Sequence, residues 1–98
     1  MAIPLKKFAG QCEEVAMANG KLTPSSSLTV TQHEISRHWR NLCRATSFNS
    51  ETGNGYSEKE VCAAGVIIAT LTYLQRIGCK DIEKLLYDTL EHQRRQSL

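Results

Sequence analysis

The fold is decided by the stretch from Ser57 to Gly78, which reads SEKEVCAAGVIIATLTYLQRIG. Its first four residues form a capping box, in which Ser57 caps a helix and the Glu60 side chain reaches back to the Ser57 backbone. The residues that follow are apolar on nearly every side, as is typical of a buried helix. The sequence therefore predicts a central buried helix that runs to Ile77 and ends at Gly78.

Three further helices are predicted around this one. The first spans about Pro4 to Asn19, with proline in its first turn and Gly20 just after its end. The second begins among the serines at 25–27 and runs to about Thr46. The third spans about Lys80 to Arg95. Residues 28–31 also fit a short strand, but no second strand exists to pair with it, so we prefer a helix there.

The segments between these helices are rich in turn-forming residues, namely residues 21–27 and 47–56. The second helix is expected to pack through an apolar stripe made of Leu28, Ile35, Trp39, Leu42 and Cys43. The predicted fold class is all-α, a compact bundle of about four helices that forms one domain over residues 1–98. A chain of 98 residues buries only a modest core, so we expect a homodimer or a dimer of dimers.

Composition excludes several classes of function. The chain has 22% charged residues and a formal net charge of +2, with basic and acidic residues interleaved, so a nucleic-acid partner is not expected. Its longest apolar stretch, Val61 to Leu74, contains threonines and is too short to span a bilayer. The beginning of the sequence shows no secretory signal pattern. We expect a cytoplasmic protein with no membrane partner.

Motifs of common catalytic sites are absent. The four cysteines, Cys12, Cys43, Cys62 and Cys79, form no C-x-x-C pair and are predicted to be reduced core thiols. His33 and Glu34 begin a pattern similar to H-E-x-x-H, but the next histidine, His38, comes one residue too late for zinc. No phosphate-binding glycine loop and no nucleophile-and-base pattern is present.

The informative feature is the order of several short motifs. Glu34-Ile35-Ser36 lies on the second predicted helix, Val66-Ile67-Ile68 on the third, and Gly78 precedes Asp81-Ile82-Glu83. This order resembles the short MazG-like branch of the all-α nucleotide pyrophosphohydrolases over almost the whole chain. The resemblance implies two carboxylate pairs that hold Mg²⁺ while a nucleoside triphosphate is split into a monophosphate and pyrophosphate.

This chain departs from that pattern at most of the functional positions. The four metal-ligand positions fall on Glu34, Arg37, Cys62 and Gly65. The lysine and asparagine that the family carries on its last helix fall on Thr89 and Gln93. One carboxylate beside an arginine is a poor site for a hard dication, which needs several oxygen ligands.

We therefore predict a MazG-like helical protein that is inactive or altered and that binds a nucleotide or a protein partner, besides itself. Arg37 is the candidate substrate-binding residue, because a guanidinium contacts phosphate directly without a metal. Glu34 is either a vestigial metal ligand or a surface glutamate paired with Arg37 or His38. No cofactor is expected unless the protein is active, in which case it is Mg²⁺.

Two alternatives stay open. The first is a divergent, active pyrophosphohydrolase that combines Glu34 with Glu58, Glu60 or Glu51, although Glu60 is already explained by the capping box. The second is an unrelated helical module for protein interaction, since helical bundles share such patterns readily and fold does not carry function.

Overall fold

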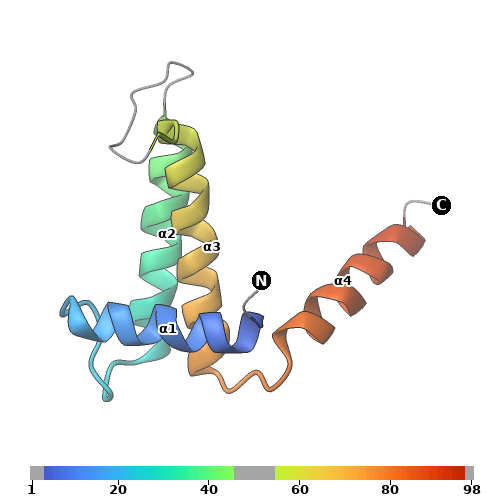
Figure 1. The fold of residues 1–98 in the computed structure, drawn as a ribbon, viewed down its shortest axis with the longest axis horizontal. Helices are drawn as coiled ribbons and strands as arrows, with labels where there is room; N and C mark the ends of the chain where they lie inside the picture. Colours follow the sequence, from blue (N-terminus) through green and yellow to red (C-terminus); the bar gives the residue numbers. More distant parts are fainter. Residues whose placement is uncertain (1–3, 46–54, 97–98) are drawn as a thin grey trace.

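The computed structural model describes residues 4–45 and 55–96, and within them it contains four α-helices and no β-strand (Figure 1). They are α1 (Leu5–Ala18), α2 (Leu28–Arg44), α3 (Glu58–Arg76) and α4 (Ile82–Gln96). The predicted all-α fold class is confirmed, and residues 28–31 belong to a helix. Most of the predicted 47–56 loop lies outside the described residues.

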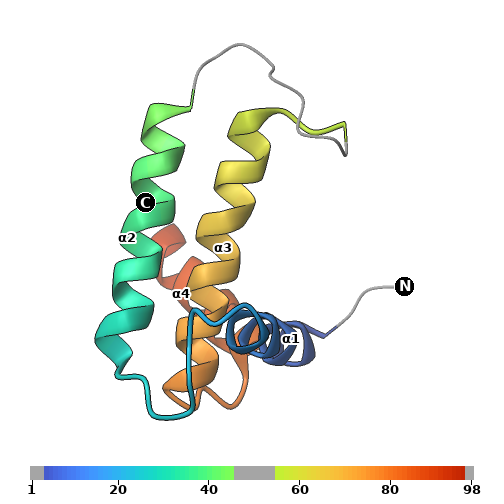
Figure 2. The same cartoon turned by 90° about the vertical axis from the view of Figure 1, so that its left-hand side faces the viewer.

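Helix α3 is the central element. It runs beside α2 for most of its length, and α1 crosses the base of this pair (Figures 1 and 2). The predicted capping box is confirmed at its start: the Glu60 N–H donates to Ser57 Oγ over 3.2 Å, and the Ser57 N–H donates to Glu60 Oε1 over 3.0 Å. Gly78 has a φ of 82°, which suits glycine and lets the chain turn away.

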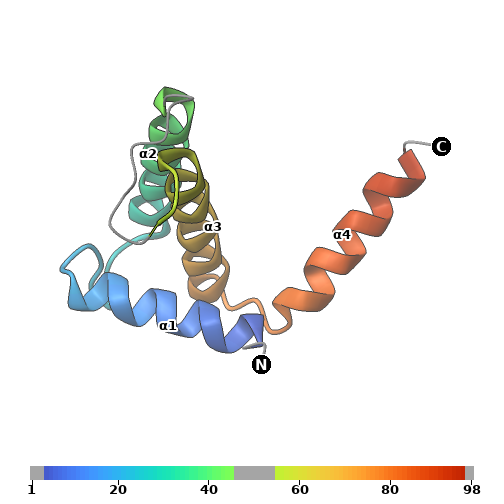
Figure 3. The same ribbon diagram turned by 45° about the horizontal axis from the view of Figure 1, so that its top comes forward.

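The main core lies where α1, α3 and α4 meet. It is formed by the buried residues Ala9, Cys12, Leu71 and Ile82. Helix α4 joins this core through its first turn, where Ile82 is fully buried and Glu83 Oε1 accepts a hydrogen bond from the Leu5 N–H over 3.1 Å. Beyond that turn α4 extends away from the other helices (Figure 3).

Helix α3 is central but less buried than its composition suggests. Only Ala69, Leu71 and Thr72 are buried, whereas Val61, Ile67 and Ile68 are 41–59% exposed. The physical reason is geometric: α1 crosses only near the C-terminal end of α3, so the N-terminal half of α3 has α2 as its neighbour. The apolar residues there are only partly covered within the described part of the chain.

The cysteines also differ from expectation. All four are free thiols, and Cys12 lies in the core as predicted, where burial raises its pKa. Cys43, however, is exposed, so its placement in the core was wrong. Across residues 4–45 and 55–96, no helix combines the length and the apolar composition needed to cross a bilayer.

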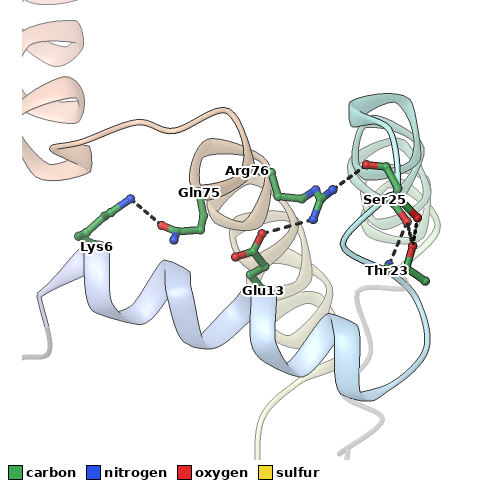
Figure 4. A network of polar contacts seen from close by, with 7 residues as sticks. Lys6, Glu13, Thr23, Ser25, Gln75 and Arg76 are labelled. Carbon is green, nitrogen blue, oxygen red and sulfur yellow. Dashed lines mark hydrogen bonds and ion pairs between the residues drawn. The ribbon is translucent and has the colours of Figure 1, made fainter.

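Arg76, near the end of α3, joins three segments. Its Nη1 lies 3.3 Å from Glu13 Oε2 of α1, and its Nη2 donates to the Ser26 carbonyl oxygen over 2.6 Å (Figure 4). Nearby, Lys6 Nζ donates to Gln75 Oε1 over 2.8 Å and to the Cys79 carbonyl over 3.0 Å. The Arg76 side chain is only 10% exposed, so its contacts are poorly replaced by water.

We expect Arg76→Ala to lower the free energy of unfolding by about 2–4 kcal/mol, because it leaves Glu13 and the Ser26 carbonyl without their partner. Urea denaturation followed by circular dichroism measures this loss. Lys84→Ala is the control, since it removes an ion pair with Asp88 in which both side chains are at least 66% exposed. Equal stability of the two variants would contradict the proposed importance of Arg76.

Candidate functional site

The face that α2 turns toward α3 is partly polar. Thr31 is buried, and Glu34, Ile35, His38 and Leu42 are partly buried at helical spacing. The predicted apolar stripe was therefore wrong in part. Leu28, Trp39 and Cys43 are exposed, Trp39 by 56%. The apolar residues of α2 span a wider arc than α3 covers, and α3 packs against the part of that arc that holds Thr31 and His38.

Glu34 and Arg37 form a two-point ion pair on α2. Arg37 Nε donates to Glu34 Oε2 over 2.7 Å, and Arg37 Nη2 donates to Oε1 over 3.4 Å. The hydrogen bond from Arg37 lowers the pKa of Glu34, so this carboxylate is ionised at neutral pH. The predicted pairing of Glu34 with Arg37 is present in the structure.

His38 extends this pair toward α3. Arg37 Nη2 lies 3.3 Å from His38 Nε2. A guanidinium has no acceptor, so Nε2 must accept this hydrogen bond, and the ring is then neutral with its proton on Nδ1. Burial, followed by the charge of Arg37, lowers the pKa of His38 in agreement with this neutral form.

The imidazole of His38 occupies the space beside Gly65. A Cβ added at Gly65 would lie 2.6 Å from His38 Nδ1, which is closer than real Cβ contacts, and 3.2 Å from Cε1, which is tight, so the imidazole would have to shift. Gly65 is the position at which the resemblance expects a metal-binding acid. In this chain, the imidazole of His38 from the facing helix lies against this position and would have to move to admit such an acid.

The described residues offer no alternative metal cluster. No group of three or more histidine, cysteine or acidic side chains in 4–45 and 55–96 is placed to hold a metal ion. The Glu60 carboxylate is engaged by Ser57 in the capping box. Glu58 lies beside it in the first turn of α3, and Glu51 lies outside the described residues.

A cavity of about 350 Å³ lies between α1, α2 and α3. Its walls are mostly apolar and include Phe8, Cys12, Val15, Ala16, Leu22, Ile68 and Ala69. Polar residues complete the lining: Thr31, Thr72, Gln11, Asn19, Lys21, Glu34 and His38. The sequence showed the apolar face of α1, but gave no indication that part of it borders a cavity.

A second, shallower groove adjoins this cavity on the outer side of α2. It measures about 620 Å³ and is lined by Lys21, Val30, His33, Glu34, Ser36, Arg37 and Arg40. Three of these residues are permanent cations, and the one acid, Glu34, is already paired with Arg37. Lys21 and Glu34 are lining residues of both the apolar cavity and the basic groove.

Comparison of the chain with protein-family models, with curated proteins and with solved structures gives no match. The MazG-like resemblance therefore rests on the motifs quoted above and stays a prediction. The contacts among Glu34, Arg37, His38 and Gly65 do not depend on that resemblance.

The contact between His38 and Gly65 predicts strong coupling between these two positions. Glycine inside a helix normally costs about 1 kcal/mol relative to alanine, so Gly65→Ala should stabilise α3 once the imidazole is gone. With His38 present, the same change forces the ring to move. A double-mutant cycle of Gly65→Ala and His38→Ala, measured by urea denaturation, should therefore give a coupling energy of about 1–2 kcal/mol. Strict additivity would show that the ring does not pack against Gly65.

Proposed function

We propose that this chain is a MazG-like helical protein that has lost, or largely lost, pyrophosphohydrolase activity, and that it binds a nucleotide without a metal ion. One observation carries the proposal. Three of the four positions expected to hold Mg²⁺ carry no carboxylate, and the space beside one of them, Gly65, is filled by His38.

The charge around Glu34 supports the loss of the metal. A magnesium ion needs several oxygen ligands at short distance, and Glu34 supplies one carboxylate. That carboxylate already has a guanidinium at 2.7 Å. A dication at the same place would have to displace Arg37 or lie beside its positive charge. Both alternatives oppose metal binding on electrostatic grounds.

The same arginine supplies a reason to expect phosphate binding. Glu34 holds Arg37 through Nε and Nη2, which fixes the plane of the guanidinium and leaves Nη1 without a hydrogen-bond partner among the described residues. Lys21 and Arg40 line the same groove. An oriented guanidinium with two neighbouring cations suits the several anionic oxygens of a nucleotide's phosphates.

We expect nucleoside mono- or triphosphates to raise the melting temperature of the protein equally with Mg²⁺ and with EDTA. Calorimetric titration of the same ligands should show Arg37→Gln weakening affinity about tenfold or more, because it removes charged hydrogen bonds to phosphate. Arg44→Gln is the matched control, with the same change of charge on the same helix outside the groove.

Other outcomes would favour the two alternatives. Magnesium-dependent release of pyrophosphate, abolished by Glu34→Gln, would overturn the proposal and identify an active enzyme. An absence of any nucleotide effect would leave a helical protein-interaction module. In that case a protein partner would have to be sought.

We also propose that the protein forms a homodimer or a dimer of dimers. The apolar residues of α4, Leu85, Leu86 and Leu90, are 40–54% exposed, and those on the N-terminal half of α3 are similarly uncovered. Together they leave apolar surface on two helices that a second copy of the chain can cover.

Light scattering at micromolar concentration should give at least twice the monomer mass of 11.0 kDa. The variant Leu86→Lys should shift the protein toward monomer, because a charge in an apolar contact is costly to bury. Tyr87→Lys is the control on the neighbouring, 73% exposed position. A monomeric wild-type protein would contradict the proposal.

A further inference from the structure

The cavity between α1, α2 and α3 is lined by both buried and exposed apolar residues. Cys12, Leu22 and Ala69 are only 4–7% exposed, whereas Val15 and Ile68 are 58% and 43% exposed. No described side chain fills the remaining volume of about 350 Å³. Contact between apolar side chains and water is unfavourable, so an apolar ligand that replaces this water would be stabilised here.

The buried polar residues of the lining offer a ligand little hydrogen bonding. The Thr72 hydroxyl already donates to the Ile68 carbonyl oxygen over 2.9 Å. The Thr31 hydroxyl has no hydrogen-bond partner among the described residues, but it also has almost no exposed surface, so a ligand in the cavity does not reach it. A polar group of a ligand would lose its hydrogen bonds to water beside these walls and gain few in return. The part of a ligand that lies there should therefore be hydrocarbon.

The volume of the cavity sets the size of this hydrocarbon group. A dry apolar cavity of about 150 Å³ in a protein is large enough to bind benzene. The present cavity is more than twice as large, at about 350 Å³. It therefore has room for a hydrocarbon chain of about ten carbon atoms.

Lys21 supplies one uncompensated positive charge at this cavity. Its ammonium group takes part in none of the ion pairs among the described residues. The acid that also lines the cavity, Glu34, is engaged by Arg37, whose Nε lies 2.7 Å from Glu34 Oε2. The pKa of Glu34 is lowered by this hydrogen bond and further by the charge of Lys21, so the ammonium group lies near this part of α2. An anionic group on a ligand would find its counter-charge at Lys21.

We propose that this cavity binds an alkyl carboxylate, whose chain lies among the apolar walls and whose carboxylate lies beside the ammonium group of Lys21. A single carboxylate matches the single uncompensated charge, and an alkyl chain needs no hydrogen bonds from the buried lining. The inference goes beyond the proposed function and does not rest on it, because it requires neither Arg37 nor a phosphate group.

Titration of decanoate into ¹⁵N-labelled full-length protein tests this site directly. The amide signals of Cys12 and Ala69 should show saturable shifts. Lys21→Gln should weaken decanoate binding about threefold, since an ion pair at an exposed lysine contributes modestly, and should leave the binding of uncharged 1-octanol unchanged. Lys7→Gln is the matched control, because Lys7 is an exposed lysine of α1 that does not line the cavity.

Variants of α1 test the position of the alkyl chain. Ala16→Leu narrows the cavity and should weaken decanoate binding about tenfold or more. Ala18→Leu is its control, the same change at an exposed position of the same helix outside the lining. Val15→Gln removes apolar surface at a position that is already 58% exposed, so the fold should be retained while decanoate binding weakens about threefold or more.

Any of three results would overturn the inference: no saturable shift at millimolar decanoate, equal weakening by Lys21→Gln and Lys7→Gln, or equal weakening by Ala16→Leu and Ala18→Leu. A fourth observation would also reject it. If the same amide signals moved with protein concentration in the absence of decanoate, a second copy of the chain would be the occupant of the cavity.

Discussion

Arg76 connects segments that lie far apart in the sequence, and the placement of the candidate site depends on it. Through Glu13 it fixes α1 against α3, and through the Ser26 carbonyl it fixes the segment that leads into α2. That segment also carries Lys21 and Leu22, which border the cavity. Because the Arg76 side chain is nearly buried, these contacts exchange little with water and hold three backbone segments in one arrangement.

The contact between His38 and Gly65 sets the chemistry of the site. It brings α2 and α3 close enough for the imidazole to lie against Gly65, so that any side chain at position 65 would require the ring to move. Glu34, Arg37 and His38 then form a chain of hydrogen bonds in which the guanidinium carries the positive charge. A covalently attached cation occupies the environment in which the resemblance expects Mg²⁺, which is the basis of the metal-free phosphate binding that we propose.

The position of α4 leaves apolar surface exposed, and this bears on whether copies of the chain associate. Its first turn is anchored by Ile82 in the core, whereas its leucines at 85, 86 and 90 are 40–54% exposed. The rest of α4 extends away from the other helices (Figure 1), and α3 is itself partly uncovered. This exposed apolar surface on two helices is the basis of the association between copies that we propose. The cavity and the groove lie on α1, α2 and the facing part of α3, so they are complete within one chain.

The sequence by itself determined the local features of this protein. The helix positions, the capping box at Ser57 and the turn at Gly78 follow from hydrogen bonds and backbone preferences between residues a few positions apart. The arginine at position 37 and the glycine at position 65, where the resemblance expects acids, were equally visible, as was the pairing of Glu34 with a neighbour on the same helix. Tertiary structure alone decided the rest. Four features depend on residues that are distant in the sequence. They are the face of α2 that meets α3, the packing of His38 on Gly65, the contacts of Arg76, and the unpaired Thr31 in a cavity wall. The spacing of apolar residues along one helix shows which of its faces is apolar. It does not show which other helix will pack against that face, because this depends on the packing of the whole chain.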